Sequence, residues 1–395
     1  MISEKMCNLG KQASVIREIF EYSKMRKAEI GEENVYDFSL GNPSVPSPQK
    51  VTDVLAELIS TKEPTALHGY TSAVGDNDVR KAIADDLNQR FNADVKPSLI
   101  YMTCGAAASL TISLKALCNP GDEVIVTTPF FPEYTVFIEN AMAVKVEVPC
   151  KKEDFTLDIN AIAKAVTPKT KAIIINSPNN PSGVVFPKEN IEALSKLLKE
   201  KSEEYNSEIF IISDEPYREL VYDNTYVPFI PEYYDNTLVC YSYSKSLSLP
   251  GERIGYIYVS SKSQNSYDIY KAVCGAGRIQ GYVCAPSLMQ YAVGKCTDQR
   301  PDISAYDINR KLIYNELLKI GYEPIKPQGA FYLFLKSLEE DANAFCERAK
   351  KYELMLVPSD SFGIKGYVRV SYCVDNAMIK RSLKAFKALF DEYNG

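Results

Sequence analysis

The sequence contains a single histidine, His68, among its 395 residues. A Ser-His-Asp or Cys-His mechanism, or a metal site built from several histidines, would have to use this residue or fail. His68 lies in the stretch ALHGYTSAVG, whose glycines and small residues predict a loop, and a lone loop histidine is more often solvent-facing or structural than catalytic. The scarcity of histidine therefore disfavours most hydrolase chemistry.

The sequence also lacks the features of membrane, secreted, zinc-binding and nucleic-acid-binding proteins. No stretch approaches the roughly 18 apolar residues of a membrane span, and the charged start MISEKMCNLGKQ lacks the apolar core of a secretory signal. Ten cysteines occur without C-x-x-C spacing, so neither a zinc site nor a disulfide framework is indicated. A net charge of -6 gives no basic surface for nucleic acid. These absences predict a protein of the reducing cytoplasm that binds neither nucleic acid nor membrane.

The length of the chain and its sequence patterns predict a two-lobed α/β protein. A chain of 395 residues is too long for one ordinary core, so a large domain with a smaller companion is expected. From about residue 98, short β-branched runs such as EVIVTTP and KAIIINSP alternate with helical patterns. Continuous apolar strands separated by helices favour a mostly parallel central sheet sandwiched by helices.

The two ends of the chain show sequence patterns that differ from those of the middle. Residues 13–30 have apolar side chains at helical spacing, and three prolines interrupt SLGNPSVPSP. After about residue 290, long helical patterns alternate with the runs AFYLFLK and YVRVSYC, which predicts a smaller α+β lobe completed by the N-terminal segment. We therefore expect a large α/β domain over residues 48–288 and a small α+β domain formed by residues 1–47 and 289–395.

The residues that follow the predicted strands carry the chemistry, because open α/β sheets bind ligands at the carboxyl ends of their strands. TCGAAASL places small residues at the start of a helix, where backbone N–H groups can hold a phosphate, although a tight turn is an equally good reading. Asp214 in IISDEPY could cap a helix or pair with a protonated ring nitrogen. NSPNNPSG could be a surface loop, or it could bring the amide of Asn180 to a ligand.

Lys245 is the most informative of these positions. It follows the apolar strand TLVCY and lies among small hydroxyl residues in YSYSKSLSLPGER. Most lysines are solvated, but an amine at this edge of the sheet could form a Schiff base with a carbonyl cofactor. A phosphate site, an aspartate for a protonated ring nitrogen, an aromatic face and this lysine together describe pyridoxal 5'-phosphate.

As an ordered set, these motifs resemble the class I/II aminotransferases of the fold-type I group of pyridoxal-phosphate enzymes, in the style of the aspartate and aromatic aminotransferases. The resemblance runs from SLGNPS near residue 40 to VRVSYC near residue 370, and it implies the fold-type I PLP-transferase fold. SYSKSLSLPGER matches the Schiff-base signature of the family, which makes Lys245 the cofactor lysine and the catalytic base. The same match gives Ser242, Ser244 and Arg253 to the cofactor phosphate.

The resemblance implies further roles around the cofactor. SDEPY gives Asp214 to the pyridinium nitrogen and Tyr217 to the phenolic oxygen, which Asn180 of NNPSG would also bond. Phe131 matches the aromatic residue that stacks on the ring, a position held by tryptophan in several relatives and necessarily not in this tryptophan-free chain. GAAAS matches the phosphate loop through Gly105, Ala106 and Ala107.

Other matching positions concern the substrate and a second subunit. Arg369 in YVRVSYC matches the arginine that grips the substrate α-carboxylate, assisted by Gly41 and Asn180. Tyr70 in GYTSAVGDNDVRKAIA matches the tyrosine that reaches the phosphate of the neighbouring subunit, which implies a homodimer with shared active sites. Tyr134 falls where some relatives place a histidine behind the pyridinium aspartate, so we expect that supporting contact to be altered or absent.

The implied reaction is ping-pong transamination between an L-amino acid and a 2-oxo acid. Two alternatives stay open from the residues: a β-C–S lyase, which shares the early steps, and a non-catalytic pyridoxal-phosphate sensor. The sensor is disfavoured because the roughly 40 residues before SLGNPS are too few for a DNA-binding module and linker. The side-chain preference is also open. A dicarboxylate substrate would need a second cation, and Arg278 of the neighbouring subunit is a candidate.

Overall fold

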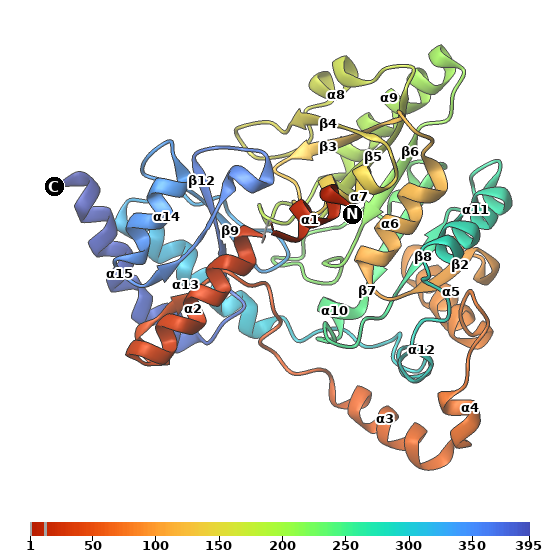
Figure 1. Cartoon of the computed structure of the whole chain (residues 1–395), viewed down its shortest axis with the longest axis horizontal. Coiled ribbons are helices and arrows are strands. Elements are labelled where there is room, and N and C mark those ends of the chain that lie inside the picture. Colours follow the sequence, from red (N-terminus) through yellow and green to blue (C-terminus); the bar gives the residue numbers. More distant parts are fainter. Residues whose placement is uncertain (1, 12–13) are drawn as a thin grey trace.

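The computed structural model describes residues 2–11 and 14–395, and its main feature is a seven-stranded sheet (Figure 1). The strand order is β2-β8-β7-β6-β5-β3-β4. Neighbouring strands pair in parallel except at β8, which runs antiparallel to both β2 and β7. The prediction of a mostly parallel sheet is therefore confirmed. The strands are β2 (Ile100–Thr103), β3 (Glu123–Thr128), β4 (Val144–Pro149), β5 (Thr170–Asn176), β6 (Phe210–Asp214), β7 (Thr237–Ser242) and β8 (Gly255–Val259).

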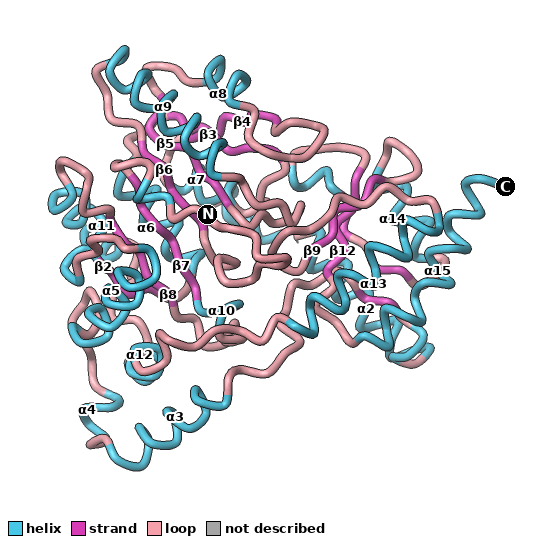
Figure 2. The backbone as a smooth tube through the Cα atoms, turned by 180° about the vertical axis from the view of Figure 1, so that it is seen from behind, coloured by secondary structure: helices cyan, strands magenta, loops and turns pink. Residues whose placement is uncertain are grey.

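Both faces of this sheet are covered, because alternate residues of its central strands point into two different cores. Val124 and Val126 of β3 and Ile174 of β5 belong to the core beneath α5, α6 and α11. Ile125 and Ile173 belong to the core beneath α8 and α9. Figure 2 shows the strands in the middle of this part of the molecule, with helices around them. The helices are α5 (Asn77–Phe91), α6 (Ala106–Leu117), α7 (Tyr134–Asn140), α8 (Ile159–Ala165), α9 (Lys188–Tyr205) and α11 (Ser266–Ile279).

A three-stranded antiparallel sheet, in the order β11-β12-β9, organises the other end of the chain. We call this part the small lobe, and the seven-stranded sheet with its helices the large lobe. Helix α2 (Val15–Ile30) packs against β10 and β11, so the N-terminal segment joins the small lobe. The expected domain boundaries at residues 47/48 and 288/289 stay a prediction. The small-lobe elements are β1 (Tyr36–Asp37), β9 (Tyr332–Lys336), β10 (Leu354–Met355), β11 (Val357–Pro358), β12 (Tyr367–Ser371), α13 (Ser304–Ile320), α14 (Ala342–Lys350) and α15 (Asn376–Asn394).

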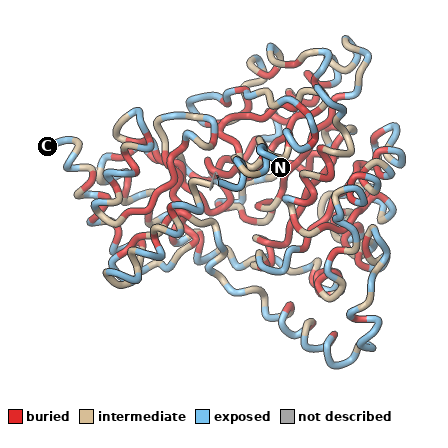
Figure 3. Tube along the Cα trace, viewed as in Figure 1, coloured by how far each residue is buried: buried red, intermediate tan, exposed pale blue. Residues whose placement is uncertain are grey.

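Helices α3 (Gln49–Thr61) and α4 (Pro64–His68) lie at the edge of the molecule, where Figure 3 shows mostly exposed residues. They pack on α12 (Ser287–Gly294), which also contacts α5. His68 ends α4 instead of lying in a loop, because Pro64 opens a short helix that the Glu63 side chain caps at the N–H of Ala66. His68 is exposed, as the sequence led us to expect.

The remaining elements are short. They are α1 (Glu4–Lys11), α10 (Tyr243–Ser246) and the 3-10 turns η1 (Glu32–Asn34), η2 (Pro97–Leu99), η3 (Ile230–Glu232) and η4 (Ser359–Phe362). No helix within residues 2–11 and 14–395 is both long and apolar enough to cross a membrane.

Candidate active site

A cavity of about 300 Å³ lies at the carboxyl ends of β5, β6 and β7. Asn176, Asp214 and Ser242 are the last residues of these three strands, and parallel pairing brings them to the same edge of the sheet. The small lobe adds Tyr332 of β9 and Arg369 of β12 to the wall. The structure thus brings together most of the positions expected from the sequence: Gly41, Ala106, Ala107, Phe131, Asn180, Asp214, Tyr217, Ser242, Ser244, Lys245, Arg253 and Arg369.

Lys245 enters the cavity from α10, a single turn that begins because the Ser242 side chain accepts a hydrogen bond from the N–H of Ser244. The Lys245 amine donates a hydrogen bond to the carbonyl of Gly41 at 2.7 Å. Burial disfavours the charged amine and lowers the pKa of Lys245 to about 8. A neutral, nucleophilic amine is therefore accessible at mildly alkaline pH.

Asp214 is buried at the end of β6, and one of its two carboxylate oxygens has no partner. Oδ2 accepts a hydrogen bond from the Tyr134 hydroxyl at 2.5 Å, while Asn176 donates to the Asp214 backbone carbonyl at 2.9 Å. Oδ1 is buried without any hydrogen-bond partner. Burial raises the pKa of Asp214 to about 7, an effect that the hydrogen bond from Tyr134 opposes. A buried oxygen of this kind calls for a proton donor or a cation from a ligand.

The contact behind Asp214 is the altered one of the two outcomes expected at position 134, where the support could be altered or absent. The structure shows that a tyrosine hydroxyl makes this contact. Tyr134 is buried at the first residue of α7, where it lies edge-on to Phe131 of the cavity wall. Burial raises the pKa of Tyr134 well above its ordinary range, so the hydroxyl stays protonated and donates a hydrogen bond to Asp214.

The start of α6 forms a cradle for an anion. Gly105 caps this helix with φ of 89°, a conformation that favours glycine, and a Cβ there would lie 2.8 Å from the guanidinium of Arg253. Arg253 donates to the hydroxyl of Ser244 at 3.4 Å, and the hydroxyls of Ser242 and Ser244 lie 2.8 Å apart. Helix N–H groups, hydroxyls and a guanidinium together suit a phosphate.

Arg369, in the part of the cavity wall that the small lobe forms, is buried, and only some of its N–H groups have hydrogen-bond partners. It donates to the side-chain oxygen of Asn180 at 3.0 Å and to the carbonyl of Ser39 at 2.5 Å, while Nε has no partner. Its guanidinium lies 4.6 Å from the ring centre of Tyr332. A Cβ at Gly41 would lie 1.9 Å from the Tyr332 hydroxyl, so this position has no room for a side chain. The arrangement suits a carboxylate ligand at Arg369.

Three expected positions do not line the cavity within this chain. Gly105 caps α6 directly before Ala106 of the cavity wall. Tyr70 follows α4 and is 97% exposed. Arg278 is exposed in the last turn of α11. Conversely, sequence reasoning missed Asn176 and Tyr332. Asn176 ends the run AIIIN, so its place at the end of a strand could have revealed it, whereas nothing local marks Tyr332, which reaches the cavity from the other lobe.

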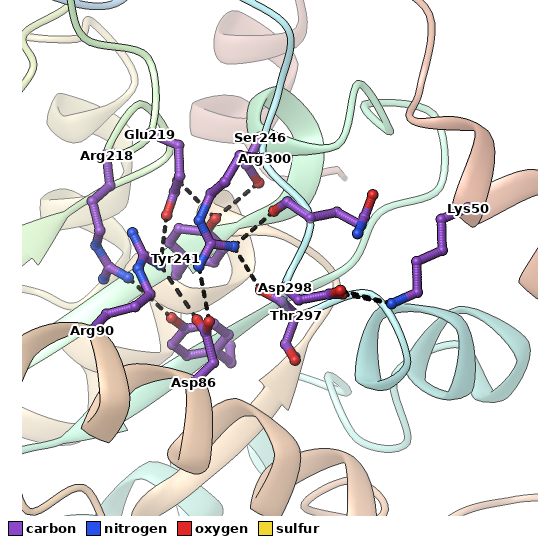
Figure 4. A network of polar contacts seen from close by, with 12 residues as sticks. Lys50, Asp86, Arg90, Arg218, Glu219, Tyr241, Ser246, Thr297, Asp298 and Arg300 are labelled. Atoms are coloured by element: carbon purple, nitrogen blue, oxygen red, sulfur yellow. Dashed lines mark hydrogen bonds and ion pairs between the residues drawn. The ribbon is translucent and has the colours of Figure 1, made fainter.

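A second polar cluster, which is partly buried, lies next to the turn that carries Lys245. We call it the rear network, and it consists of Asp86, Arg90, Arg218, Glu219, Tyr241, Ser246 and Arg300 (Figure 4). The Tyr241 hydroxyl lies 2.8 Å from both the Glu219 carboxylate and the Ser246 hydroxyl. Arg90 lies 3.0 Å from Glu219, and Arg300 lies 2.9 Å from Asp86. The network therefore ties the residue after Lys245 to the segment that leads into the small lobe.

Comparison with known proteins agrees with this architecture. The family model described as aminotransferase class I and II matches residues 33–386. An aspartate aminotransferase of Thermotoga maritima is 31% identical over 370 residues, which cover 92% of each chain. An aromatic-amino-acid aminotransferase of Thermococcus litoralis is 26% identical over 96% of each chain. A crystal structure of an aminotransferase from Eubacterium rectale superimposes with a TM-score of 0.98 at 54% identity, over the whole of both chains.

Proposed function

The chain belongs to the class I and II aminotransferase family and is a transaminase, and we propose that it works with pyridoxal 5'-phosphate bound in the cavity around Lys245. The proposal rests on one observation: an amine that loses its proton readily, a buried carboxylate oxygen without a partner and a buried arginine line the same cavity. The reaction moves an amino group between an L-amino acid and a 2-oxo acid, in two half-reactions that share the site.

The residues present fit this cofactor. When bound, pyridoxal phosphate supplies an electron sink for the charge that develops as an α-proton leaves. Oδ1 of Asp214 would take the proton-bearing ring nitrogen as its missing partner, and Tyr134 holds the carboxylate from behind. Tyr217, whose pKa burial raises well above its ordinary range, stays protonated and can donate to the phenolic oxygen together with the amide of Asn180.

The anion cradle at α6 would hold the phosphate. Ser242, Ser244, Arg253 and the backbone of Gly105, Ala106 and Ala107 provide its donors. Because alanines stand in this loop, the backbone N–H groups carry more of the binding than hydroxyl or amide side chains would. Phe131 lies where it can cover one face of the ring.

Arg369 would bind the α-carboxylate of the substrate through the Nε that lacks a partner, helped by Asn180 and the backbone at Gly41. This contact orients the amino acid so that its α-hydrogen can face Lys245. The neutral Lys245 amine then takes the α-proton and later returns it to a different carbon. Burial makes this role accessible at mildly alkaline pH, because it lowers the pKa of the amine to about 8.

We propose a cytoplasmic homodimer with shared active sites. Tyr70 of each protomer would reach the phosphate in the partner, which accounts for a large tyrosine side chain that is 97% exposed in the single chain. The proposed domains, residues 48–288 and residues 1–47 with 289–395, would meet around the cavity. Mixing Tyr70→Phe protomers with Arg253→Ala protomers should restore part of the activity if the sites are shared.

Absorption spectroscopy of the purified protein from about 300 to 500 nm tests the proposal. We expect a long-wavelength cofactor band that disappears in Lys245→Ala, persists in the control Lys365→Ala, and converts to a shorter-wavelength form with some amino acids. Absence of cofactor from the wild-type protein contradicts the site. Release of pyruvate and ammonia without any 2-oxo acid acceptor points instead to β-elimination.

A further inference from the structure

Tyr332 joins two parts of the cavity to which the proposed function gives separate roles. Its hydroxyl, which reaches the cavity from β9 of the small lobe, lies 3.0 Å from the hydroxyl of Tyr217. Its ring centre lies 4.6 Å from the Arg369 guanidinium. One side chain of the small lobe therefore contacts both the tyrosine that would bond the cofactor and the arginine that would bind the substrate.

The surroundings of Tyr332 hold its side chain in one place. The residue is buried, and the pairing of β9 with β12 sets it opposite Ser371. Its ring meets that of Tyr217 edge-on, with the ring centres 5.7 Å apart. The hydroxyl occupies the space in which a side chain at Gly41 would stand. The Tyr332 hydroxyl is thus confined between the backbone of Gly41 and the hydroxyl of Tyr217.

The direction of the hydrogen bond between the two tyrosines follows from the number of protons. Burial raises the pKa of both hydroxyls, so each of them keeps its proton. A tyrosine hydroxyl has one proton to donate, while its oxygen can also accept. Once Tyr217 donates to the phenolic oxygen of the cofactor, its contact with Tyr332 requires Tyr332 as the donor. A hydroxyl that accepts a hydrogen bond in this way becomes a stronger donor itself.

We propose that Tyr332 is a positioning residue, whose hydroxyl donates to Tyr217 and strengthens the hydrogen bond from Tyr217 to the phenolic oxygen of the cofactor. The inference rests on the proposed function, since it takes pyridoxal phosphate to be bound beside Tyr217. The ring of Tyr332 has a second role, because its face supports the guanidinium of Arg369. The hydroxyl and the ring can therefore be tested separately.

The first test is a pH titration of the cofactor band in the protein loaded with pyridoxal phosphate. In Tyr332→Phe the charge on the phenolic oxygen is stabilised less, so the cofactor should hold its proton about threefold more tightly and the midpoint should rise by about 0.5 pH unit. Tyr217→Phe should shift the midpoint further. The control Tyr322→Phe removes a buried hydroxyl that donates to the Phe386 carbonyl at 3.0 Å, and it should leave the midpoint unchanged.

A double variant separates positioning from simple packing. If Tyr332 acts through Tyr217, adding Tyr332→Phe to Tyr217→Phe should move the midpoint no further, because no hydroxyl remains to be strengthened. The same four proteins without cofactor, unfolded in urea, give a readout that needs neither cofactor nor turnover. The effects of the two substitutions on the unfolding constant should differ from additivity by at least about threefold.

The role of the ring is tested by binding of an unreactive carboxylic acid, 4-methylpentanoate, followed through the cofactor spectrum. Tyr332→Leu removes the ring and should weaken this binding about fivefold, whereas Tyr332→Phe keeps the ring and should change it less than about twofold. Thermal unfolding of both variants checks that they are folded.

An unchanged midpoint in Tyr332→Phe overturns the proposal, and so does an equal shift with and without the Tyr217 hydroxyl. Additive effects on unfolding show that the two hydroxyls are not coupled, which also overturns it. Absence of cofactor from the wild-type protein contradicts the proposed function, and the role at the phenolic oxygen is then wrong as well. The unfolding measurements still decide in that case whether Tyr332 holds Tyr217.

Discussion

Two polar clusters flank Lys245, one in the buried wall of the cavity and one in the partly buried rear network, and they differ in how their charges are compensated. In the rear network, Glu219 faces both Arg90 and the Tyr241 hydroxyl, and Asp86 faces Arg300. Glu219 Oε1 and Arg218 Nη2 of the rear network lack a hydrogen bond, but they face the opposite charges of Arg90 and Glu215. In the cavity, Oδ1 of Asp214 and Nε of Arg369 are buried with no hydrogen-bond partner, and neither side chain forms an ion pair with another described residue. Because an unpaired buried polar group is costly, a protein keeps one where a ligand completes it. We therefore infer that the rear network stabilises the fold, whereas the polar groups of the cavity are completed by a ligand.

The largest effect should come from removing the cavity carboxylate. Asp214→Asn takes away the charge that would keep the ring nitrogen of the proposed cofactor protonated, so we expect the half-reaction with any amino acid substrate to slow about a thousandfold, equivalent to about 4 kcal/mol. Rapid-mixing absorption measurements provide the rate. Asp235→Asn, which changes an exposed aspartate just before β7, is the matched control and should react normally.

The same carboxylate should make the cofactor-free protein sensitive to pH. Burial raises the pKa of Asp214 from its ordinary value of 3.8 to about 7, so the folded protein binds this proton more tightly than the unfolded chain does. The free energy of unfolding should therefore fall as the pH rises from about 4 to about 7, by at most about 4 kcal/mol from this group.

Urea unfolding of the cofactor-free wild type and Asp214→Asn at pH 5 and pH 8 isolates this contribution. The wild type should lose stability relative to the variant at the higher pH. If the difference in unfolding free energy between the two proteins is the same at both pH values, Asp214 does not cause the pH dependence. Adding the cofactor should abolish the effect in the wild type, because the ring nitrogen then pairs with the carboxylate.

Removing a charge from the rear network should destabilise the protein at pH 8, whereas removing the charge of Asp214 should not. Glu219→Gln leaves the half-buried Arg90 with a weaker set of partners, so we expect the free energy of unfolding to fall by about 2 kcal/mol, between the values for exposed and fully buried ion pairs. Asp85→Asn breaks an ion pair with Lys81 that is more than half exposed and should cost less than about 1 kcal/mol. Urea unfolding at pH 8 measures both. If Glu219→Gln unfolds with the same free energy as the wild type, the rear network does not stabilise the fold and the distinction from the cavity is wrong.

Sequence patterns predicted the elements that have local signals. The runs that became β3 and β5 are continuously apolar because the sheet is covered on both faces, and the segments after such strands led to Asn180, Asp214 and Lys245. Strand β4 lies at the sheet edge with several exposed residues, so it lacks an apolar run and was not anticipated.

Features built from distant segments could not be predicted in this way. Tyr332 and Ile16 reach the cavity only because the small lobe folds against the large one, and no spacing in the sequence encodes that approach. The rear network likewise joins α5, the segment after β6, strand β7 and the segment after α12. At Tyr134, the residue type left open whether the contact is altered or absent, and the structure shows that its hydroxyl reaches Asp214.

The smallest effect should come from Tyr134. This residue bears on both the reaction rate and the pH dependence because its hydroxyl supports the Asp214 carboxylate. Tyr134→Phe removes the hydrogen bond to Oδ2 that holds the pKa of Asp214 down, so the carboxylate should take up a proton more readily and bind the ring nitrogen less firmly. We expect the half-reaction to slow about tenfold, or about 1.4 kcal/mol, with its dependence on pH moved to higher pH. Tyr234→Phe is the control, since it removes a buried hydroxyl that donates to the Ile209 carbonyl at 2.7 Å. Ile209 directly precedes β6, at the opposite end of that strand from Asp214. A loss of stability common to both variants, with no change in the pH profile of Tyr134→Phe, would reduce Tyr134 to a packing residue. A shifted profile in that variant alone makes its hydroxyl the group that sets how strongly Asp214 holds the cofactor.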